Sequence, residues 1–476
     1  RLFDLERQVS GESLLGKAMS VGPLAMADVD GDGLLDLFVG GRAVAGRYPE
    51  AAPSLLLRNT GGRFEVTQRF AGDRSVGLVN GATLADLDQD GDPDLLMAVE
   101  WGPVRVWRNT QGTFEPWDPL VRGAGVGGDP VRLSQLTGWW TSVAVGDFDG
   151  DGRLDWVVGN RGWNWFPVPH APGRSDELAN RRYLRSGELA GTGGLAILES
   201  YRVEGREVAL RRADVLFEAL PQLREAFPTR AALGVAGIPQ LLSALKLGAE
   251  GPPLEAGWFA TTLFLNRGDH LEARPLPVEA QFAPVSGLSV ADFDGDGHAD
   301  VFLAQNFFPV RPDEVPQDAG CGLLLRGTGG GSFESVSPQR SGIRVWGDAR
   351  GSAVGDFDQD GRPDLVVTQN GGATRLFRNR VGRPGLSVRL NGPPENPRGI
   401  GAQLRLRAGD WGGPVQEVQS GTGWLSVDSP RRILTSERVP TELELRWPGR
   451  PAIRVALPAG SRVVELTPDG KILRAP

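Results

Sequence analysis

Cysteine, histidine and long apolar runs are scarce in this chain of 476 residues. The one cysteine, Cys321, cannot form an internal disulfide, so stability must come from packing and bound ions, and we expect this thiol to be a small core residue. The three histidines, His170, His270 and His298, do not have the spacing of a zinc site. No apolar run approaches about eighteen residues, so the sequence predicts no membrane-spanning segment.

Catalytic and nucleic-acid-binding motifs are lacking as well. The formal net charge is −8 at pH 7, which argues against nucleic acid as a partner. Residues 398–402 match a fragment of a phosphate-binding loop, but a β-turn is the better interpretation because no helix is predicted to follow. The Arg-Gly-Asp tripeptide at residues 267–269 matches a short integrin-recognition sequence, and we interpret it as a chance match in a hairpin turn. No constellation of acid, base and nucleophile is evident, so the sequence predicts a protein that is not an enzyme.

What the chain has in abundance is one acidic pattern, Asp-x-Asp-x-Asp-Gly-x-x-Asp. Its five copies span residues 28–36, 86–94, 147–155, 292–300 and 356–364. In a tight loop, carboxylates at positions one, three and five converge on one point, and glycine at position six permits the sharp turn. A backbone carbonyl at position seven and a fourth carboxylate at position nine complete the oxygen shell that Ca²⁺ prefers over the stricter octahedron of Mg²⁺. The sequence therefore predicts about five bound Ca²⁺ ions, one in each loop.

The predicted ligands are four carboxylates and one backbone carbonyl in each loop. They are Asp28, Asp30, Asp32, Leu34 and Asp36; Asp86, Asp88, Asp90, Asp92 and Asp94; Asp147, Asp149, Asp151, Arg153 and Asp155; Asp292, Asp294, Asp296, His298 and Asp300; and Asp356, Asp358, Asp360, Arg362 and Asp364. An EF-hand is the nearest alternative, but it requires a glutamate at position twelve, where this chain has only apolar residues. Asp and Gly also favour turns without a metal, yet five copies with the same four aspartates favour metal sites.

Two kinds of strand signal accompany the loops. Each loop runs into four or five residues rich in Val, Leu and Phe, which predicts a buried strand rather than an exiting helix. An apolar strand with an Asn/Gly turn and, in most copies, an apolar return then predicts a hairpin. The hairpin copies lie at residues 57–64, 107–114, 265–271, 325–333 and 377–379. Together the two elements define a unit of about sixty residues, a period typical of arrays in which no unit buries its apolar face alone.

The interval between the third and fourth loops is too long for one unit. The hairpin at residues 265–271 has no acidic loop of its own upstream, and residues 195–205 lie where one is expected. We interpret this stretch as a sixth unit that has lost its metal. Leu, Val and Phe then recur at helical spacing, which predicts a helical insertion of two or three short helices at about residues 211–250.

The acidic loops with their trailing strands resemble the FG-GAP (VCBS-type) repeats of integrin-like β-propellers, over roughly residues 20–385. The tail resembles the ASPIC/UnbV domain that follows such repeats in cartilage-acidic-protein-like proteins. The segments that carry the second likeness are residues 396–406, 417–424 and 445–449. The tail departs from that pattern at residues 430–434, where a Gly-rich His-Phe-Gly segment is expected, so any role of this segment is in doubt.

The resemblance implies an all-β fold with two domains. The first, residues 1–385, is expected to be a calcium-binding β-propeller; the sequence contains six units, while integrin-like relatives suggest seven blades. The second, residues 386–476, is expected to be a small ASPIC/UnbV-like β-domain. Its apolar and polar residues alternate, with Pro and Gly between the runs, which predicts a separate β-domain without the resemblance as well.

Calcium loops of modest affinity work best where calcium is abundant, which favours an extracellular or periplasmic location or a comparable lumen. The chain begins at Arg1 rather than Met, and we expect that a signal segment has been removed. The sequence predicts a calcium-stabilised binding or scaffold protein that contacts a protein or glycan partner, for example in cell adhesion. The alternative is a secreted polysaccharide hydrolase or lyase built on a propeller, which would need paired carboxylates outside the metal loops.

Thirteen tryptophans against three tyrosines are a further signal. Trp139, Trp140, Trp163 and Trp165 flank the third acidic loop. Exposed tryptophans would stack on sugars or anchor a protein partner. Large aromatic residues also fill gaps between packed sheets, and the sequence leaves both interpretations open.

Overall fold

The computed structural model describes residues 19–70, 72, 75–124, 129–164, 181–188, 195–203, 205–247, 252–311, 314–421 and 425–475. Strands account for 46% of the structure and helices for 9%, which confirms that the chain is mostly β. None of the described helices is long and apolar enough to cross a membrane. Two residues considered above, Trp165 and His170, lie outside the described residues.

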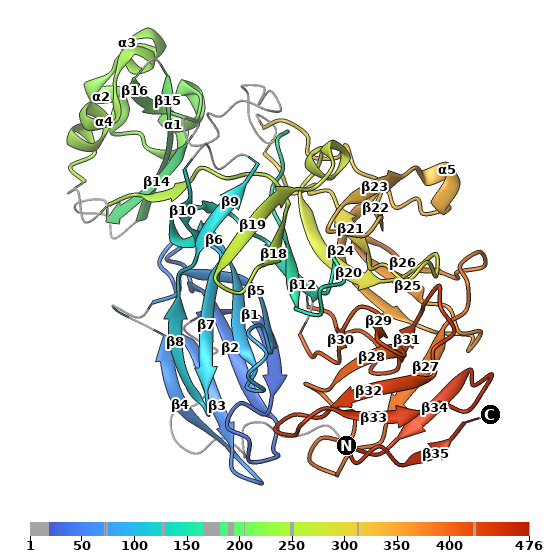
Figure 1. Ribbon diagram of the computed structural model, residues 1–476. Helices are drawn as coiled ribbons and strands as arrows, with labels where there is room; N and C mark the ends of the chain where they lie inside the picture. Colours follow the sequence, from blue (N-terminus) through green and yellow to red (C-terminus); the bar gives the residue numbers. More distant parts are fainter. Residues whose placement is uncertain are drawn as a thin grey trace.

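Five antiparallel sheets each contain one acidic loop between their first two strands (Figure 1). The first sheet has β1 (Met19–Ala27), β2 (Asp36–Val44), β3 (Ser54–Asn59) and β4 (Phe64–Phe70), and the second has β5 (Leu78–Ala85), β6 (Asp94–Pro103), β7 (Arg105–Thr110) and β8 (Thr113–Trp117). The third has β12 (Ser142–Gly146), β13 (Asp155–Gly159), β18 (Thr262–Asn266) and β19 (His270–Pro275), and the fourth has β20 (Val285–Ala291), β21 (Asp300–Gln305), β22 (Leu323–Gly327) and β23 (Phe333–Val336). The fifth has β24 (Asp348–Gly355), β25 (Asp364–Asn370) and β26 (Gly372–Phe377). The strand predicted after each loop is therefore confirmed, as β2, β6, β13, β21 and β25.

Shorter elements extend these sheets. Strand β11 (Thr137–Trp139) pairs with β6, and β9 (Leu120–Gly123) with β10 (Val131–Arg132) adds to the third sheet through β19. The 3-10 helices η3 (Leu133–Gln135) and η5 (Val278–Gln281) and the helix α5 (Pro338–Ser341) lie in the connections.

The first strands of the five sheets lie against one another in chain order, β1 beside β5, β5 beside β12, β12 beside β20 and β20 beside β24. Apolar side chains of neighbouring sheets form shared cores. Between the first two sheets, for example, Phe38 and Phe70 pack with Leu84, Met97 and Trp107. Neighbouring sheets thus bury apolar side chains against one another, as the units of a repeat array do.

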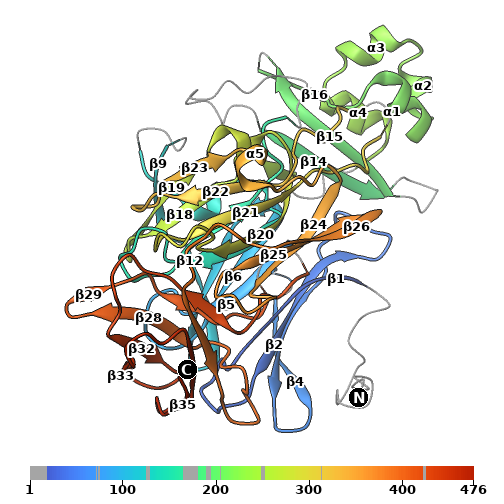
Figure 2. The same ribbon diagram turned by 90° about the vertical axis from the view of Figure 1, so that its right-hand side faces the viewer.

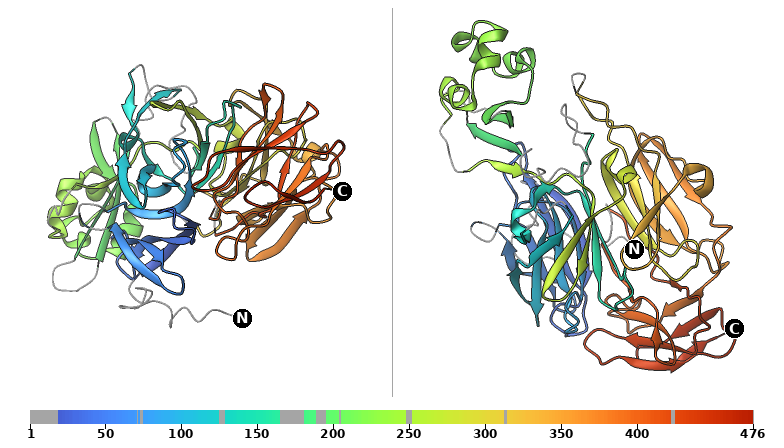
Figure 3. Two further views of the ribbon diagram at one scale, coloured as in Figure 1. Left: turned by 60° about the horizontal axis from the view of Figure 1, so that its bottom comes forward. Right: turned by 45° about the horizontal axis from the view of Figure 1, so that its top comes forward.

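The prediction that residues 195–205 belong to a sixth unit with the hairpin at residues 265–271 is wrong. Trp156 of β13 pairs with Phe264 of β18, so the hairpin at residues 265–271 belongs to the third acidic loop. The residues between β13 and β18 instead form a separate sheet of β16 (Arg206–Ala209), β15 (Leu195–Val203), β14 (Arg182–Glu188) and β17 (Leu254–Ala256). Four helices pack with this sheet, α1 (Ala213–Ala219), α2 (Leu223–Ala226), α3 (Arg230–Val235) and α4 (Ile238–Ala244). Figures 1 and 3 show this insertion projecting away from the row of sheets.

The tail forms two small sheets around a core of its own, which includes Val388, Leu404, Leu445 and Val464. One sheet has β31 (Arg432–Leu434), β27 (Leu386–Leu390), β34 (Val463–Leu466) and β35 (Ile472–Arg474); the other has β29 (Trp411–Gly412), β28 (Gln403–Ala408), β32 (Glu442–Arg446) and β33 (Ile453–Ala456), with β30 (Gln416–Glu417) beside β28. In β28 the residues alternate between buried and partly buried, as the sequence predicts. We call residues 386–475 the C-terminal unit.

The C-terminal unit contacts both ends of the row of sheets (Figure 2). The N–H of Met26 in β1 donates to the carbonyl of Ser420 at 3.4 Å, and the N–H of Ser429 donates to the carbonyl of Val354 in β24 at 2.8 Å. Ser420 therefore lies beside the first of the end strands and Ser429 beside the last. No closed ring of sheets is found among the described residues, so the number of blades stays a prediction.

Candidate metal sites on the acidic loops

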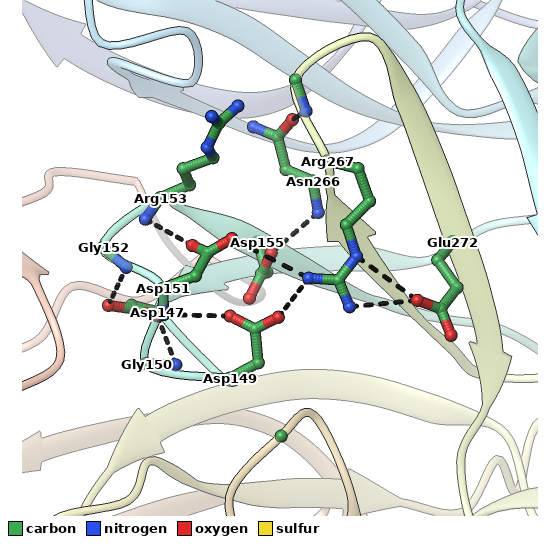
Figure 4. Close-up of polar contacts among 12 residues, drawn as sticks. Asp147, Asp149, Gly150, Asp151, Gly152, Arg153, Asp155, Asn266, Arg267 and Glu272 are labelled. Carbon is green, nitrogen blue, oxygen red and sulfur yellow. Dashed lines mark hydrogen bonds and ion pairs between the residues drawn. The ribbon is translucent and has the colours of Figure 1, made fainter.

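The first aspartate of each loop folds over its own turn. The carboxylate of Asp147 accepts from the N–H of Gly150 at 2.8 Å and from the N–H of Gly152 at 3.0 Å (Figure 4). Both glycines have positive φ, 79° and 91°, a conformation that glycine adopts without a steric cost. These bonds orient the carboxylate toward the centre of the turn.

In each of the five loops, carboxylate oxygens of three aspartates lie within 4.8 Å of one another. The groups are Asp28, Asp30 and Asp32; Asp86, Asp88 and Asp90; Asp147, Asp149 and Asp155; Asp292, Asp294 and Asp296; and Asp356, Asp358 and Asp360. In the third loop, the ninth-position Asp155 takes the place of the fifth-position Asp151 in this group. The fifth-position aspartate of every loop accepts a hydrogen bond from the backbone N–H of the seventh residue. Oxygen-only donors of this charge suit a hard divalent cation.

The ninth-position aspartate has a second task, because it joins the loop to the hairpin that follows. Asp155 accepts from the N–H of Phe148 at 3.0 Å and from the N–H of Asn266 at 2.8 Å. The equivalent aspartates of the other loops accept the same two kinds of bond. Burial raises the pKa of Asp94, Asp155 and Asp300 to about 8.

The residues present fit a bound cation. The Oδ1 atoms of Asp86 and Asp358 are buried and have no hydrogen-bond partner. Burial also raises the pKa of Asp86 and Asp147 to about 6, since a carboxylate withdrawn from water is disfavoured without a compensating positive charge. A bound ion would supply that charge. The position-seven carbonyls of Leu34, Asp92, Arg153, His298 and Arg362 stay predicted ligands.

The sequence reasoning missed one arginine at every loop. Each comes from the end of the third strand of its sheet and reaches the third-position aspartate. The pairs are Arg58 with Asp30 at 2.6 Å, Arg108 with Asp88 at 3.4 Å, Arg267 with Asp149, Arg326 with Asp294 at 3.8 Å, and Arg378 with Asp358. Figure 4 shows Arg267 between the third loop and Glu272. The signal was the arginine that recurs within the hairpin signature.

An asparagine beside three of these arginines joins neighbouring units. The side-chain amide of Asn109 donates to the carbonyl of Val29 at 2.8 Å, in the loop of the preceding sheet. Asn266 donates to Leu87 at 2.7 Å, and Asn379 to Phe293 at 2.6 Å. Each of these hydrogen bonds ties one acidic loop to the next sheet in the row.

The C-terminal unit contacts the first aspartate of three loops. Arg446 Nη1 lies 2.7 Å from Asp86 Oδ2. The N–H of Val415 donates to Asp147 Oδ2 at 3.0 Å, and the hydroxyl of Thr435 donates to Asp292 Oδ2. Three of the five candidate metal sites therefore lie at the interface between the row of sheets and the C-terminal unit.

The described tryptophans near the third loop pack against other side chains of the protein. Trp140 is fully buried and lies in the core with Val143 and Phe264, and Trp163 packs against that core. Trp139 is partly buried, and its ring centroid lies 4.3 Å from the guanidinium carbon of Arg161. These contacts place two of the tryptophans in the packing between sheets.

Of the other residues considered in the sequence, Arg267 and His270 contact acidic side chains, and Cys321 lies outside the core. Arg267 of the Arg-Gly-Asp tripeptide bonds the third loop and Glu272, at 3.0 Å from the latter. His270 lies 2.7 Å from Asp269, and His298 is exposed within the fourth loop. Cys321 is partly exposed, so its prediction as a core residue is wrong; it lies in the connection between β21 and β22.

Known proteins share this repeat. The FG-GAP-like repeat family matches residues 28–97 and 86–158, and the FG-GAP repeat family matches residues 349–382. A T-cell immunomodulatory protein of Rattus norvegicus is 24% identical over 355 residues, which are 67% of this chain and 53% of that protein. The chain thus spans about half the length of this curated relative.

Two solved structures show weak likeness. BBS1N in complex with ARL6DN is 11% identical, covering 77% of this chain and 95% of that one, with a TM-score of 0.22. The biofilm matrix protein Bap1 of V. cholerae is 13% identical, covering 76% of this chain and 67% of that one, with a TM-score of 0.21.

The family matches cover the first three acidic loops and the fifth. Residues 28–158 thus match the FG-GAP-like repeat, and residues 349–382 match the FG-GAP repeat.

Proposed function

We propose that this protein is a non-enzymatic, calcium-stabilised binding or scaffold protein that works outside the cytoplasm. The observation that carries the proposal is the convergence of three carboxylates in each of five repeated loops. FG-GAP repeats are typical of extracellular proteins of the adhesion type, which supports this location and role. We also propose that the row of sheets is a propeller-like array and that the C-terminal unit is an ASPIC/UnbV-like domain.

The proposed role of calcium is mechanical. Each loop joins the first two strands of its sheet, and its ninth aspartate joins the loop to the third strand. A bound ion supplies positive charge among the carboxylates. This charge offsets both the repulsion between them and the free-energy cost of burying them. The chain's own contribution is to hold the carboxylates in place with backbone N–H groups. A stiffened array would then present its loops and the helical insertion to a protein or glycan.

Counting bound calcium tests this proposal. We expect about five ions per chain, about four after Asp296→Ala, and no change after Tyr201→Phe in the insertion, which carries no acidic loop. Thermal unfolding should occur at a markedly lower temperature in excess EDTA than in millimolar calcium, through ligand linkage. Identical melting in both solutions, or turnover of a polysaccharide by the purified protein, would contradict the proposal.

A further inference from the structure

Among the residues that the structure describes, no fourth strand completes the fifth sheet as one completes each of the other four. In the first four sheets, the third strand is covered on its outer edge by β4, β8, β19 or β23. In the fifth sheet the chain leaves β26 for the C-terminal unit, so β26 is the edge. Residues 372–376 are exposed, and Leu376 keeps 42% of its surface accessible. An edge strand of this kind is a template for pairing with another strand.

The direction of the backbone groups near the end of β26 follows from one hydrogen bond and the strand register. The N–H of Asn379 donates to Asp364 Oδ1 at 2.8 Å, so Asn379 turns this group toward β25. Phe377 pairs with Leu365 and Arg375 with Val367, with no register shift between these pairs. Because backbone groups alternate along a strand, Leu376 presents its N–H and its carbonyl to the open edge.

Beside this edge lies a hollow of about 390 Å³ between the fourth and fifth sheets. Its apolar lining includes Leu324, Val336, Ile343, Leu365, Phe377 and Val381. In two other sheets, the apolar residue near the start of the fourth strand is buried, as Phe114 and Leu271 are. The fifth sheet has no fourth strand to supply such a residue, so an added strand has room for an apolar side chain.

The surroundings of β26 are basic. Arg340, Arg375 and Arg380 are exposed and make no ion pair with any residue that the structure describes. A second copy of this chain would bring the same arginines to the edge, and like charges would oppose its pairing. We propose that β26 binds an extended, acidic segment of a partner protein by strand addition, with an apolar side chain of that segment in the hollow. This inference rests on the proposed binding function and names the chemistry of its partner.

Fluorescence anisotropy with labelled octapeptides tests the proposal on the full chain in millimolar calcium. One peptide alternates Glu with Val, and a control peptide alternates Lys with Val. We expect the acidic peptide to bind and the basic one not to bind. Leu376→Pro should weaken binding about tenfold, because it removes an outward N–H without breaking a bond to β25. Leu376→Ala keeps that N–H and should change binding less than about twofold.

The charge is tested separately with the double variant Arg375→Glu and Arg380→Glu, which should weaken binding about tenfold or more at low salt and less at high salt. Equal binding of both peptides, binding of neither, or no effect of Leu376→Pro would overturn the proposal. Dimerisation that Leu376→Pro abolishes in analytical ultracentrifugation would overturn it too, because a second copy would be the occupant. Calcium counts on the same samples separate the two proposals: about five ions with no peptide binding refutes only the role of β26, whereas no bound calcium refutes the proposed function.

Discussion

At the scale of single residues, the arginine opposite each acidic loop decides the charge balance of the loop. Arg58 lies 2.6 Å from Asp30 Oδ2 and 3.1 Å from Asp32 Oδ2. These two carboxylates occupy the third and fifth positions of the loop, where the proposed ion would bind. The guanidinium and a cation therefore compete for the same oxygens, and the arginine is a counter-charge that belongs to the metal-free loop.

Replacing this arginine should separate the two roles. We expect Arg58→Met to bind calcium at the first loop about two- to fivefold more tightly, because a competing positive charge is gone. The same variant should melt at a lower temperature than the wild type in EDTA, since its carboxylates lose their counter-charge. Isothermal titration calorimetry and thermal unfolding measure the two effects.

Arg63→Met is the matched control, because Arg63 lies on the same hairpin and pairs only with the exposed Glu65. Neither quantity should change in this variant. Weaker calcium binding by Arg58→Met would show that the arginine supports the loaded site rather than competing with it.

At the scale of elements, the asparagines of the hairpin turns hold neighbouring sheets together. Asn266 is 3% exposed, and its amide donates to Leu87 in the preceding unit and to Leu154 in its own. Asn59 occupies the equivalent place in the first sheet, before which the structure describes no other sheet, and its side-chain amide donates to Leu35 of its own loop at 3.2 Å. The two residues share their local geometry and differ in the link between sheets.

We expect Asn266→Ala to lower the free energy of unfolding by about 1–3 kcal/mol, because the buried carbonyl of Leu87 loses its partner. Asn59→Ala should lower the free energy of unfolding less than Asn266→Ala does, with a difference of about 1 kcal/mol or more between the two variants, since no link between units is broken. Urea unfolding in millimolar calcium measures both. Equal losses would mean that the asparagine stabilises only its own turn.

The elements that sequence could predict are those whose causes are local. The acidic loops and strands such as β13 follow from spacing and composition within about fifteen residues. The place of β18 could not be predicted, because its pairing with β13 spans a long insertion with its own sheet and helices. The contacts of Arg267 and Asn266 with residues of other strands were hidden for the same reason, although both residues stood in the recurring hairpin signature.

At the scale of the whole molecule, the C-terminal unit packs against the acidic loops. Its Glu417 is buried, and burial raises the pKa of that carboxyl to about 8. Glu417 also accepts a hydrogen bond from the N–H of Asp86 at 3.3 Å. With the bonds of Arg446, Val415 and Thr435 to three loops, the docked face of the unit depends on the conformation of those loops.

Removing calcium should therefore loosen the C-terminal unit as well as the sheets. The linker between β26 and β27 carries the exposed Arg380, after which trypsin can cleave once the linker opens. We expect cleavage there to be several-fold faster in EDTA than in calcium, because local opening precedes proteolysis. Arg446→Ala should accelerate cleavage even in calcium, since it removes the ion pair with Asp86.

Arg454→Ala is the control for this effect, because Arg454 lies in the same unit, is 54% exposed and contacts only glutamates of that unit. Its cleavage rate should match that of the wild type. If calcium slows cleavage equally in Arg446→Ala and in the wild type, the ion stabilises the linker without acting through this contact. If calcium protects the wild type and fails to protect Arg446→Ala, the loaded loop and the C-terminal unit are coupled through Asp86.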